Sequence, residues 1–309
     1  MKIVILDRAT LGLDIDLSKL NQFGEVKTYD YTNEKDTIDR LIDCDIVITN
    51  KVLITKEVID NTNLKLICVS ATGTNNVDVE YAKHKKIEVK NVAGYSTISV
   101  AQLTFSLVLN FIQKLNYYSN YVKNGNWHKS EIFTHIDKPF MDLGGKTWGI
   151  IGLGNIGERV GKIAKAFDCN INYYSTTNMN FNTSYNTTNL TTLLETSDII
   201  SIHCPLNEKT KDLLNYENMK LLKNGAIIIN VARGGIINEY DIPKILKEKN
   251  LYFGLDTVSI EPIEEDSPLN EILEHENVVI TPHIAWASVE SRNRLIDGIY
   301  KNIERFINE

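Results

Sequence analysis

Three polar residues stand at or just after the ends of apolar, β-branched runs in the second half of the chain. Arg233 follows "IIINVA", Glu261 comes shortly after "YFGLDT", and His283 follows "VVIT". In an open parallel sheet the carboxyl ends of the strands form one edge, and ligands bind there. We therefore expect these three side chains to gather at one edge of a sheet.

The three residue types predict a specific chemistry when they lie together. An imidazolium such as that of His283 donates a proton near neutral pH. A carboxylate on the other ring nitrogen favours the charged form and fixes the ring. The planar guanidinium group of Arg233 can bind a carboxylate through two N–H groups and polarise the adjacent carbonyl group. Taken singly, each residue has a plainer interpretation: a surface salt bridge for Arg233, a solvated carboxylate for Glu261, and a local hydrogen bond for His283.

A glycine pattern in the same half of the chain is typical of a nucleotide-binding turn. "GLGNIG" places Gly152, Gly154 and Gly157 between an apolar run and a segment with helical spacing. Gly152 allows a tight turn, Gly154 lets the backbone approach a pyrophosphate, and Gly157 permits close contact between helix and strand. The start of the helix then offers N–H donors to the phosphates. This context predicts a dinucleotide site, and the alternative is a glycine-rich turn without a ligand.

The residue expected to bind the adenosine ribose is not acidic. A carboxylate is expected at the end of the next strand, and "INYYSTTN" has Ser175 at that position. A serine can bind a ribose hydroxyl but does not repel a 2′-phosphate. Since no Arg or Lys stands nearby to attract that phosphate, we favour NAD as the cofactor and leave NADP open.

Short apolar runs alternate with helical patterns almost from end to end. This alternation predicts an α/β fold with parallel sheets covered on both faces. We expect two domains with doubly wound parallel sheets, one formed by residues 1–97 and 287–309 and a Rossmann domain formed by residues 98–286. A long helical pattern covers residues 99–122, a last helix covers residues 288–308, and residues 176–192 are expected to be a loose polar loop. The expected strands are residues 2–6, 25–30, 45–49, 64–70, 87–92, 147–154, 171–175, 198–204, 226–232, 252–257 and 278–283.

The composition excludes several classes of function. The 309 residues carry a net charge of −7 and an isoelectric point near 5.5, which argues against a nucleic-acid surface but not against a small anionic substrate. The amino terminus lacks the pattern of a signal peptide, and the apolar run of residues 105–112 is far shorter than a membrane span. The four cysteines form no CxxC pair, so we expect no metal site and a cytoplasmic protein with reduced thiols.

Six motifs in order give the chain a resemblance to a known family. They are "ATGTNNVD" (71–78), "GLGNIG" (152–157), "HCPLNEKT" (203–210), "NVARGG" (230–235), "GLDTVSIEP" (254–262) and "TPHIAWAS" (281–288). Over essentially its full length the chain resembles the D-isomer-specific 2-hydroxyacid dehydrogenases. The resemblance implies an NAD(P)-dependent enzyme, usually a homodimer, whose substrate binds in a cleft between a flavodoxin-like domain and the Rossmann domain. Its catalytic residues would be Arg233, Glu261 and His283.

The resemblance also implies the binding residues. The substrate carboxylate would be held by backbone N–H groups of Thr72, Gly73 and Thr74, with Arg233 opposite; the alternative for that loop is a plain turn. Lys51 is a further candidate for meeting a substrate anion, although such lysines are often only solvated. The cofactor contacts would fall on Asn155, Ile156, Ser175, Cys204, Pro205, Thr210, Val231, Ala232 and, near the carboxamide, Asp256.

Several functions fit these residues. "YYST" and "HIAWAS" look like the glycerate or hydroxypyruvate branch, which implies a small 2-keto acid such as hydroxypyruvate or glyoxylate. A formate-type dehydrogenase pairs its histidine with glutamine, whereas this chain has Glu261. Phosphoglycerate oxidation without a regulatory domain stays open, and so does a dinucleotide-sensing corepressor. We interpret His203 as a structural residue rather than a catalytic one.

Overall fold

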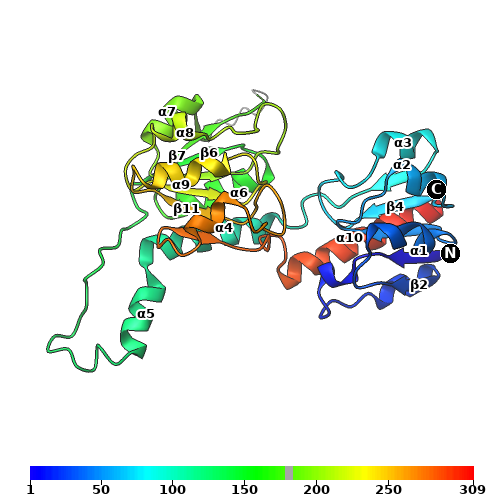
Figure 1. The fold of residues 1–309 in the computed structure, drawn as a ribbon, viewed down its shortest axis with the longest axis horizontal. Helices are drawn as coiled ribbons and strands as arrows, with labels where there is room; N and C mark the ends of the chain where they lie inside the picture. The colour runs from blue at the N-terminus through cyan, green and yellow to red at the C-terminus, as the bar shows by residue number, and fades with distance from the viewer. Residues whose placement is uncertain (178–183) are drawn as a thin grey trace. The chain divides into compact units, whose positions relative to one another are not determined.

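The computed structural model describes residues 1–177 and 184–309, and these form two compact units. Unit 1 comprises Met1–Ser96 and Trp286–Glu309, so it is built from both ends of the chain. Unit 2 comprises Thr97–Ala285. Each unit has its own parallel sheet, as Figure 1 shows, and its own hydrophobic core.

Unit 1 is a five-stranded parallel sheet in the order β2-β1-β3-β4-β5. This order is that of flavodoxin-like folds, as predicted. Its strands are β1 (Lys2–Ile5), β2 (Glu25–Thr28), β3 (Ile46–Thr49), β4 (Leu66–Val69) and β5 (Glu88–Lys90). Its helices are α1 (Thr37–Leu41), α2 (Lys56–Asp60), α3 (Val79–His84) and α10 (Val289–Asn308), with short 3₁₀ helices at Arg8–Leu11, Ser18–Phe23 and Glu34–Asp36.

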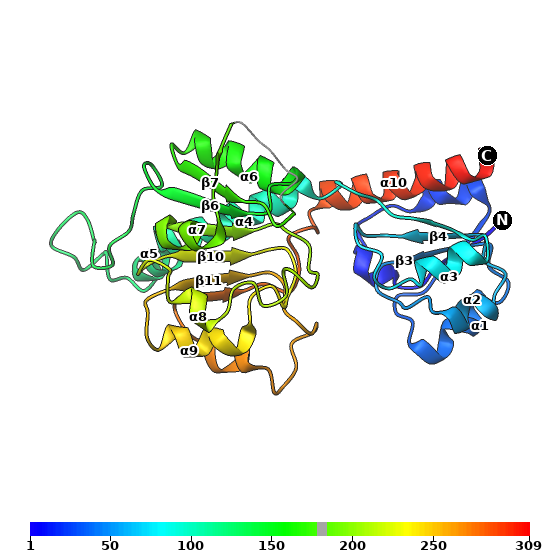
Figure 2. The ribbon, with the colours of Figure 1, turned by 90° about the horizontal axis from the view of Figure 1, so that it is seen from above.

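Alternate residues of the unit 1 strands enter two separate cores. In β1, Ile3 and Ile5 pack on the side that α10 covers, whereas Val4 packs on the opposite side with residues of α2 and α3. This is the alternation that a strand buried on both faces requires. Helix α10, which Figure 2 shows running along one face of the sheet, begins at the N-cap Ser288 and contributes Leu295 and Ile299 to the core.

Unit 2 is a seven-stranded parallel sheet in the order β12-β11-β10-β9-β6-β7-β8. The strands are β6 (Thr147–Ile151), β7 (Asn170–Tyr174), β8 (Asn186–Thr187), β9 (Ile199–Ile202), β10 (Ile227–Asn230), β11 (Tyr252–Leu255) and β12 (Val278–Ile280). The helices are α4 (Thr97–Gln113), α5 (Leu115–Lys123), α6 (Asn155–Ala166), α7 (Leu190–Thr196), α8 (Tyr216–Met219) and α9 (Ile242–Leu246), with 3₁₀ helices at Glu239–Asp241 and Pro268–Ile272.

The strand order of unit 2 reverses direction between β6 and β9. The first strand of the unit, β6, pairs with β7 on one side and with β9 on the other. This is the Rossmann order, in which a dinucleotide binds at the carboxyl ends of the strands where the order reverses. Gly152 directly follows β6, and His203 directly follows β9. The predicted fold class is confirmed, and it brings the glycine motif to the reversal point.

Two local predictions were wrong. The helical pattern of residues 99–122 forms two helices, because Lys114 takes a left-handed conformation with φ of 49° between α4 and α5. The polar stretch expected as a loop contains the two-residue edge strand β8 and the start of α7, although residues 178–183 within it lie outside the described part of the chain. So short a strand gives no periodic signal.

No single helix in the described ranges is both long and apolar enough to cross a bilayer. Helices α4 and α5 meet that requirement only as a pair, and they are bent by 57° at their break.

Candidate active site

Glu261 and His283 form a direct pair in unit 2. The Glu261 Oε2 atom lies 2.7 Å from Nδ1 of His283. Both side chains are partly accessible, at 30% for Glu261 and 24% for His283. A second Glu261 oxygen, Oε1, accepts a hydrogen bond from the Val258 backbone N–H at 3.4 Å. A carboxylate on Nδ1 orients the ring and leaves Nε2 as the nitrogen available to a ligand.

A buried carboxylate shapes the loop that carries His283. Asp256, 1% exposed, directly follows β11. It accepts hydrogen bonds from the Thr281 hydroxyl at 2.6 Å and from the backbone N–H groups of Ile284 and Ala285 at 2.9 and 2.8 Å. Within this turn His283 has a φ of 52°, a left-handed conformation that costs free energy for a residue with a side chain. The three bonds to Asp256 offset that cost.

Burial raises the pKa of Asp256 above its ordinary value, and the hydrogen bonds from the Thr281 side chain and from the backbone of Ala285 and Ile284 act in the opposite direction. A carboxylate has about four acceptor positions. Since three donors of the His283 loop already occupy it, about one position stays open for a ligand N–H group. The predicted carboxamide contact of Asp256 is compatible with this geometry and stays a prediction.

Arg233 is held by its own backbone rather than by a carboxylate. The side chain of Asn230, the last residue of β10, donates to the Arg233 carbonyl oxygen at 2.8 Å and accepts from the Ala232 N–H at 3.1 Å. The guanidinium is exposed, and its Nη1 donates to the Ala232 carbonyl oxygen at 2.8 Å. It forms no ion pair with any carboxylate of the described residues, so the surface salt bridge considered above is not present there.

The three glycines of "GLGNIG" occupy three different environments. Gly152 has a φ of 90°, and a Cβ atom there would lie 2.7 Å from the Cys204 nitrogen. A Cβ on Gly157 would overlap the Gly152 carbonyl oxygen, which shows how closely α6 packs against the turn after β6. A Cβ on Gly154 would meet no atom of the described residues within 4 Å. Protein packing therefore explains two of the glycines, and open space at the start of α6 surrounds the third.

This open space fits a dinucleotide. Gly154 is the N-cap of α6, and no side chain caps the helix there. The first N–H groups of a helix are unpaired and favour an anion. Asn155 and Ile156, the first two residues of α6, are therefore placed to bind phosphate through their backbone.

The remaining predicted cofactor contacts follow the neighbouring strands β7, β9 and β10. Ser175 directly follows β7, and its hydroxyl is buried without a hydrogen-bond partner among the described residues. Contact with a ribose would require that hydroxyl to rotate outward. Thr210 is 1% exposed, and its hydroxyl donates to the Pro205 carbonyl oxygen at 2.7 Å, so it closes the loop after β9. The other predicted contacts at these strand ends are Cys204, Val231 and Ala232.

Comparison with known proteins identifies the family. Residues 105–285 match the family model described as the D-isomer specific 2-hydroxyacid dehydrogenase, NAD binding domain. A hydroxypyruvate reductase of Blautia hydrogenotrophica is 40% identical over 99% of this chain and 97% of the relative. A glycerate dehydrogenase of Methylorubrum extorquens is 34% identical over 99% of this chain and 96% of the relative. The chain belongs to the D-isomer-specific 2-hydroxyacid dehydrogenase family.

A solved structure of a D-lactate dehydrogenase from Aquifex aeolicus, in complex with NAD and lactic acid, supports the same assignment. It superimposes with a TM-score of 0.84 at 26% identity and covers 100% of this chain and 96% of that one. The predicted family and fold are confirmed. The dehydrogenase has an NAD-binding domain in unit 2, as the sequence predicts.

The predicted substrate-binding residues of the dehydrogenase lie at the carboxyl edge of the unit 1 sheet. Lys51 follows β3, and Thr72 to Thr74 follow β4, the neighbouring parallel strand. The loops that carry them are joined, because the Asn76 side chain donates to the Val52 carbonyl oxygen at 3.1 Å. The sheet therefore brings Lys51 and the threonine loop to the same edge, and their roles stay predictions.

His203 has the environment of a structural residue. Both of its ring nitrogens are buried and lack a hydrogen-bond partner among the described residues. Burial lowers the pKa of His203 to about 3, so the ring is neutral at physiological pH. Its backbone N–H donates to the Ile151 carbonyl oxygen at 2.8 Å, which ties the ends of β9 and β6 together.

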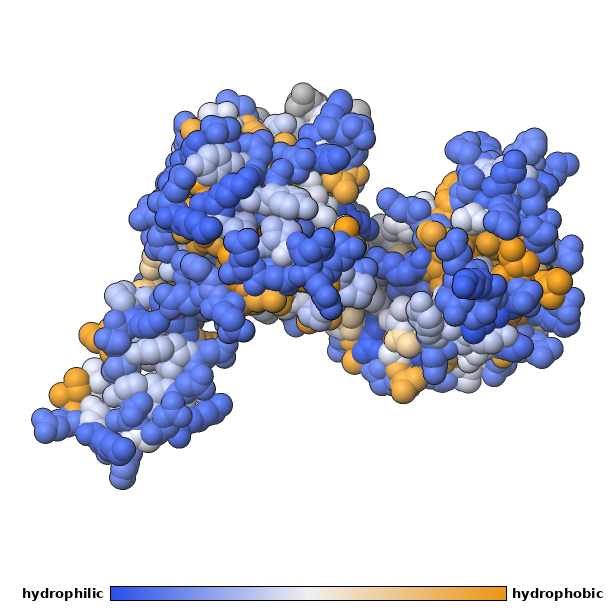
Figure 3. Space-filling model, viewed as in Figure 1, coloured by the Kyte–Doolittle hydropathy of each residue, from blue (hydrophilic) through white to orange (hydrophobic). Residues whose placement is uncertain are grey.

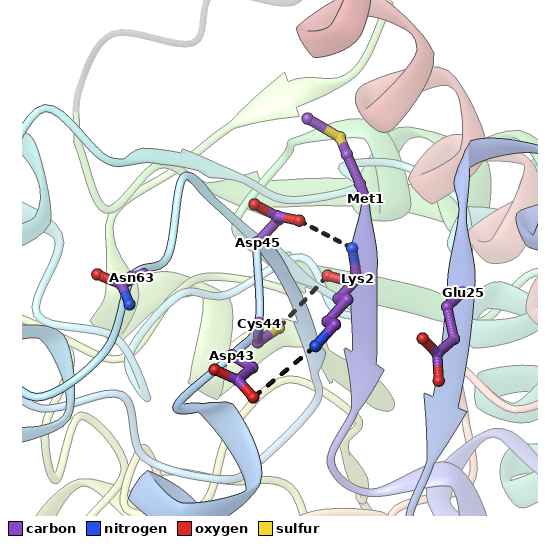
Figure 4. A pocket seen from close by; sticks show the side chains of 7 residues that line it. All are labelled: Met1, Lys2, Glu25, Asp43, Cys44, Asp45 and Asn63. Carbon is purple, nitrogen blue, oxygen red and sulfur yellow. Dashed lines mark hydrogen bonds and ion pairs between the residues drawn. The ribbon is translucent and has the colours of Figure 1, made fainter.

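Unit 1 also contains a pocket of about 480 Å³ (Figure 4). It is at the amino ends of β1 and β2 and just before β3, on the edge of the sheet opposite to Lys51. Three of its charged side chains interact with one another: the Lys2 ammonium lies 3.7 Å from Asp43, and the Lys2 backbone N–H donates to Asp45 at 2.8 Å. Its lining residues are Met1, Lys2, Glu25, Asp43, Cys44, Asp45 and Asn63.

Sequence reasoning missed two carboxylates that organise the loops described above. Asp7 accepts hydrogen bonds from the backbone N–H groups of Asn50 and Lys51 at 2.9 and 2.7 Å. Glu239 accepts one from the Ser259 N–H at 2.6 Å. Asp7 gives a signal in the sequence, because a charged residue directly after the apolar run "KIVIL" predicts a special role. Glu239 gives none, because its partner lies 20 positions away in the chain.

Proposed function

We propose that the dehydrogenase reduces a small 2-keto acid to the D-2-hydroxy acid with NADH or NADPH, and catalyses the reverse reaction. The observation that carries this proposal is the 2.7 Å pair of Glu261 and His283 at the carboxyl end of the NAD-binding sheet. The hydroxypyruvate reductase and glycerate dehydrogenase to which the chain is similar act on small acids of this class. We therefore propose hydroxypyruvate and glyoxylate as the first substrates to test.

Each of the predicted site residues has a separate role in the proposed reaction. When bound, the nicotinamide supplies the hydride that is added to the carbonyl carbon. His283 donates the proton that the carbonyl oxygen gains, and Glu261 stabilises the imidazolium through Nδ1. Arg233, whose guanidinium has no carboxylate partner among the described residues, binds the substrate carboxylate and polarises the carbonyl. For unit 1, we propose that the backbone N–H groups of Thr72, Gly73 and Thr74, with Lys51, bind a substrate anion.

A panel of 2-keto acids tests this proposal directly. Purified protein is mixed with NADH or NADPH and with hydroxypyruvate, glyoxylate, pyruvate or 3-phosphohydroxypyruvate, and the absorbance of the reduced cofactor is followed. We expect turnover of hydroxypyruvate or glyoxylate. Cofactor binding without turnover of any acid would contradict the proposal and support a sensing protein. Preferred reduction of 3-phosphohydroxypyruvate would support the serine-synthesis alternative. Formate oxidation is not expected, because Glu261 stands where formate-type enzymes have glutamine.

The ribose position determines which cofactor is preferred. Ser175 presents no negative charge to a 2′-phosphate, so the Ser175→Asp variant adds the repulsion that the wild type lacks. We expect the ratio of NADH to NADPH catalytic efficiency to rise about tenfold, equivalent to about 1.4 kcal/mol. Ser175→Asn, whose side chain has the shape of aspartate without its charge, is the control. An unchanged ratio in the aspartate variant would show that other residues determine the preference.

We also propose that the protein is a homodimer that works in the cytoplasm. All four cysteines are buried free thiols, as suits a reducing compartment. The support for a dimer is an arm of unit 2, formed by α5 and residues 124–142, which projects from the rest of the unit (Figure 1) and which Figure 3 shows as mostly hydrophilic with a few hydrophobic spots. Its exposed apolar side chains include Phe133 at 88% and Ile136 at 70%. The others are Leu115, Val122, Trp127, Ile132, Phe140 and Met141.

The arm is ordered although its apolar side chains are exposed. The Tyr121 and His135 rings stack with centroids 3.6 Å apart, and the Lys138 ammonium pairs with Glu276 at 2.8 Å. An ordered extension that exposes this much apolar surface is typical of an interface between subunits. A second copy of the chain is the occupant that we propose.

Sedimentation velocity tests the dimer. We expect the wild type to sediment as a dimer of the 35.1 kDa chain and the Phe133→Asp/Ile136→Asp variant to shift toward monomer. Leu13→Asp, at a residue of unit 1 that is 82% exposed, is the control and is expected to remain a dimer. A monomeric wild type, or an arm variant that sediments as the wild type does, would overturn the proposal.

A further inference from the structure

The loops that carry Arg233 and Glu261 touch each other through their backbones. A Cβ atom on Gly234 would overlap the Val258 carbonyl group and the Ser259 nitrogen. Gly234 is adjacent to Arg233, and Ser259 precedes Glu261 by two positions. The separation of these two loops therefore determines where the guanidinium and the Glu261–His283 pair lie relative to one another.

One side chain connects the two loops. Glu239, at the start of the 3₁₀ helix Glu239–Asp241, accepts a hydrogen bond from the Ser259 N–H at 2.6 Å. Glu239 itself stands at the end of the segment that follows β10 and carries Arg233, and hydrogen bonding by the Ser259 side chain and the Gly235 backbone lowers the pKa of its carboxyl group. Burial raises the pKa of Glu239, these bonds lower it, and the nearby charge of Glu261 raises it further.

A second acid so near the Glu261–His283 pair is unfavourable unless it makes other contacts that stabilise it. Glu239 makes such a contact with the Ser259 backbone N–H at 2.6 Å, a donor that is fixed in position and binds a carboxylate well. The Gly235 carbonyl oxygen in turn accepts a hydrogen bond from the Asp212 N–H at 2.8 Å, so the loop that carries Arg233 is itself held in place.

We propose that Glu239 is a positioning residue, whose carboxylate clamps the Arg233 loop to the Glu261 loop and so fixes the distance between the substrate-binding guanidinium and the proton donor. The inference rests on the function proposed above, since it assigns Glu239 an effect on that reaction. Glu239 acts on the reaction only through the residues that it holds.

The main variant is Glu239→Ala, which removes the carboxylate that binds the Ser259 N–H. A misplacement of about 1 Å lowers the rate of an enzyme about 100-fold. We therefore expect kcat for hydroxypyruvate or glyoxylate to fall about 10- to 100-fold, with the NADH dissociation constant unchanged. Glu239→Gln keeps one acceptor oxygen, and we expect an intermediate loss of about two- to fivefold by the same argument. Glu274→Ala, at an exposed glutamate of unit 2, is the control and is expected to behave as the wild type.

A double-mutant cycle separates positioning from a general structural effect. If Glu239 acts through the Glu261–His283 pair, its removal costs less in the His283→Ala background than in the wild type. Equal losses in the two backgrounds would overturn the proposal, and so would wild-type kcat in Glu239→Ala. If the alanine variant does not fold, wild-type kcat in the glutamine variant overturns it instead.

Amide hydrogen exchange tests the clamp without any turnover. We expect the Ser259 and Gly235 amides to exchange faster in Glu239→Ala than in the wild type, and Glu274→Ala to leave both unchanged. Wild-type exchange rates would overturn the clamp even if the enzyme is active. Faster exchange in a protein that reduces no keto acid would leave the clamp standing and contradict the proposed function alone.

Discussion

In each unit a buried carboxylate at the carboxyl edge of the sheet binds the loop after a neighbouring strand, but the two loops carry different functional side chains. In unit 1, Asp7 follows β1 and binds the loop after the neighbouring strand β3, which carries Lys51. In unit 2, Asp256 follows β11 and binds the loop after the neighbouring strand β12, which carries His283. Both carboxylates are nearly inaccessible, at 4% and 1% exposure. In both, burial raises the pKa above its ordinary value.

The difference lies in what each loop presents. The Asp256 loop holds His283 in a left-handed conformation and against a second carboxylate, Glu261. The Asp7 loop presents the exposed Lys51 through backbone bonds. A ring that must transfer a proton needs a fixed orientation, whereas an ammonium acts as a point charge and tolerates movement. The account therefore predicts large effects on kcat in unit 2 and smaller effects on substrate binding or stability in unit 1.

The largest effect is expected for His283→Ala. Loss of a general acid lowers turnover about 100- to 10,000-fold. NADH affinity, measured by fluorescence titration, is expected to stay within twofold of the wild type, because the phosphate site at Gly154 is separate. Wild-type rates of keto-acid reduction in this variant would refute the role of His283.

The next effect is expected for Asp256→Asn. The Asn side chain has one acceptor oxygen, so its amide N–H group would face one of the three donors of the His283 loop. We expect kcat to fall about 10- to 100-fold through misplacement of the ring, in steady-state assays at saturating cofactor. Thr281→Val removes only the 2.6 Å hydroxyl bond and is expected to lose less. A variant that loses NADH affinity but keeps kcat would instead assign Asp256 to the carboxamide alone.

A smaller effect is expected for Lys51→Ala in unit 1. Removal of one exposed charge is expected to raise KM for the keto acid about tenfold, or about 1.4 kcal/mol, while kcat changes little. Steady-state kinetics with hydroxypyruvate measure both constants. A loss of kcat comparable to that of His283→Ala would contradict the difference that we expect between the two loops.

The smallest effect is expected for Asp7→Asn, and it concerns stability rather than rate. The pKa of Asp7 is raised in the folded state. Its protonation therefore stabilises the folded wild type fully below the ordinary pKa of 3.8, and this stabilisation is lost as the pH rises through the folded pKa. The asparagine variant lacks this titration. Urea unfolding at a series of pH values should show the wild type losing stability relative to the variant as the pH rises. A difference that is independent of pH would contradict the raised pKa.

The sequence predicted those parts of the fold and site that leave a local signal. Long β-branched runs predicted the strands, and polar residues at their ends predicted Arg233, Glu261 and His283. The break at Lys114 was missed because a left-handed lysine has no sequence signature, and β8 was missed because it has two residues. Glu239 was missed for a different reason, since its bond to the Ser259 N–H forms only after packing brings the two segments together.

A crystal structure of the dehydrogenase with NADH and the unreactive keto-acid analogue oxamate tests the central claim most directly. We predict that His283 Nε2 lies within about 2.6–3.2 Å of the carbonyl oxygen of the analogue, and that the Arg233 guanidinium binds its carboxylate. An analogue bound against the nicotinamide ring with another side chain at the carbonyl oxygen, and His283 or Arg233 out of reach, would contradict the account.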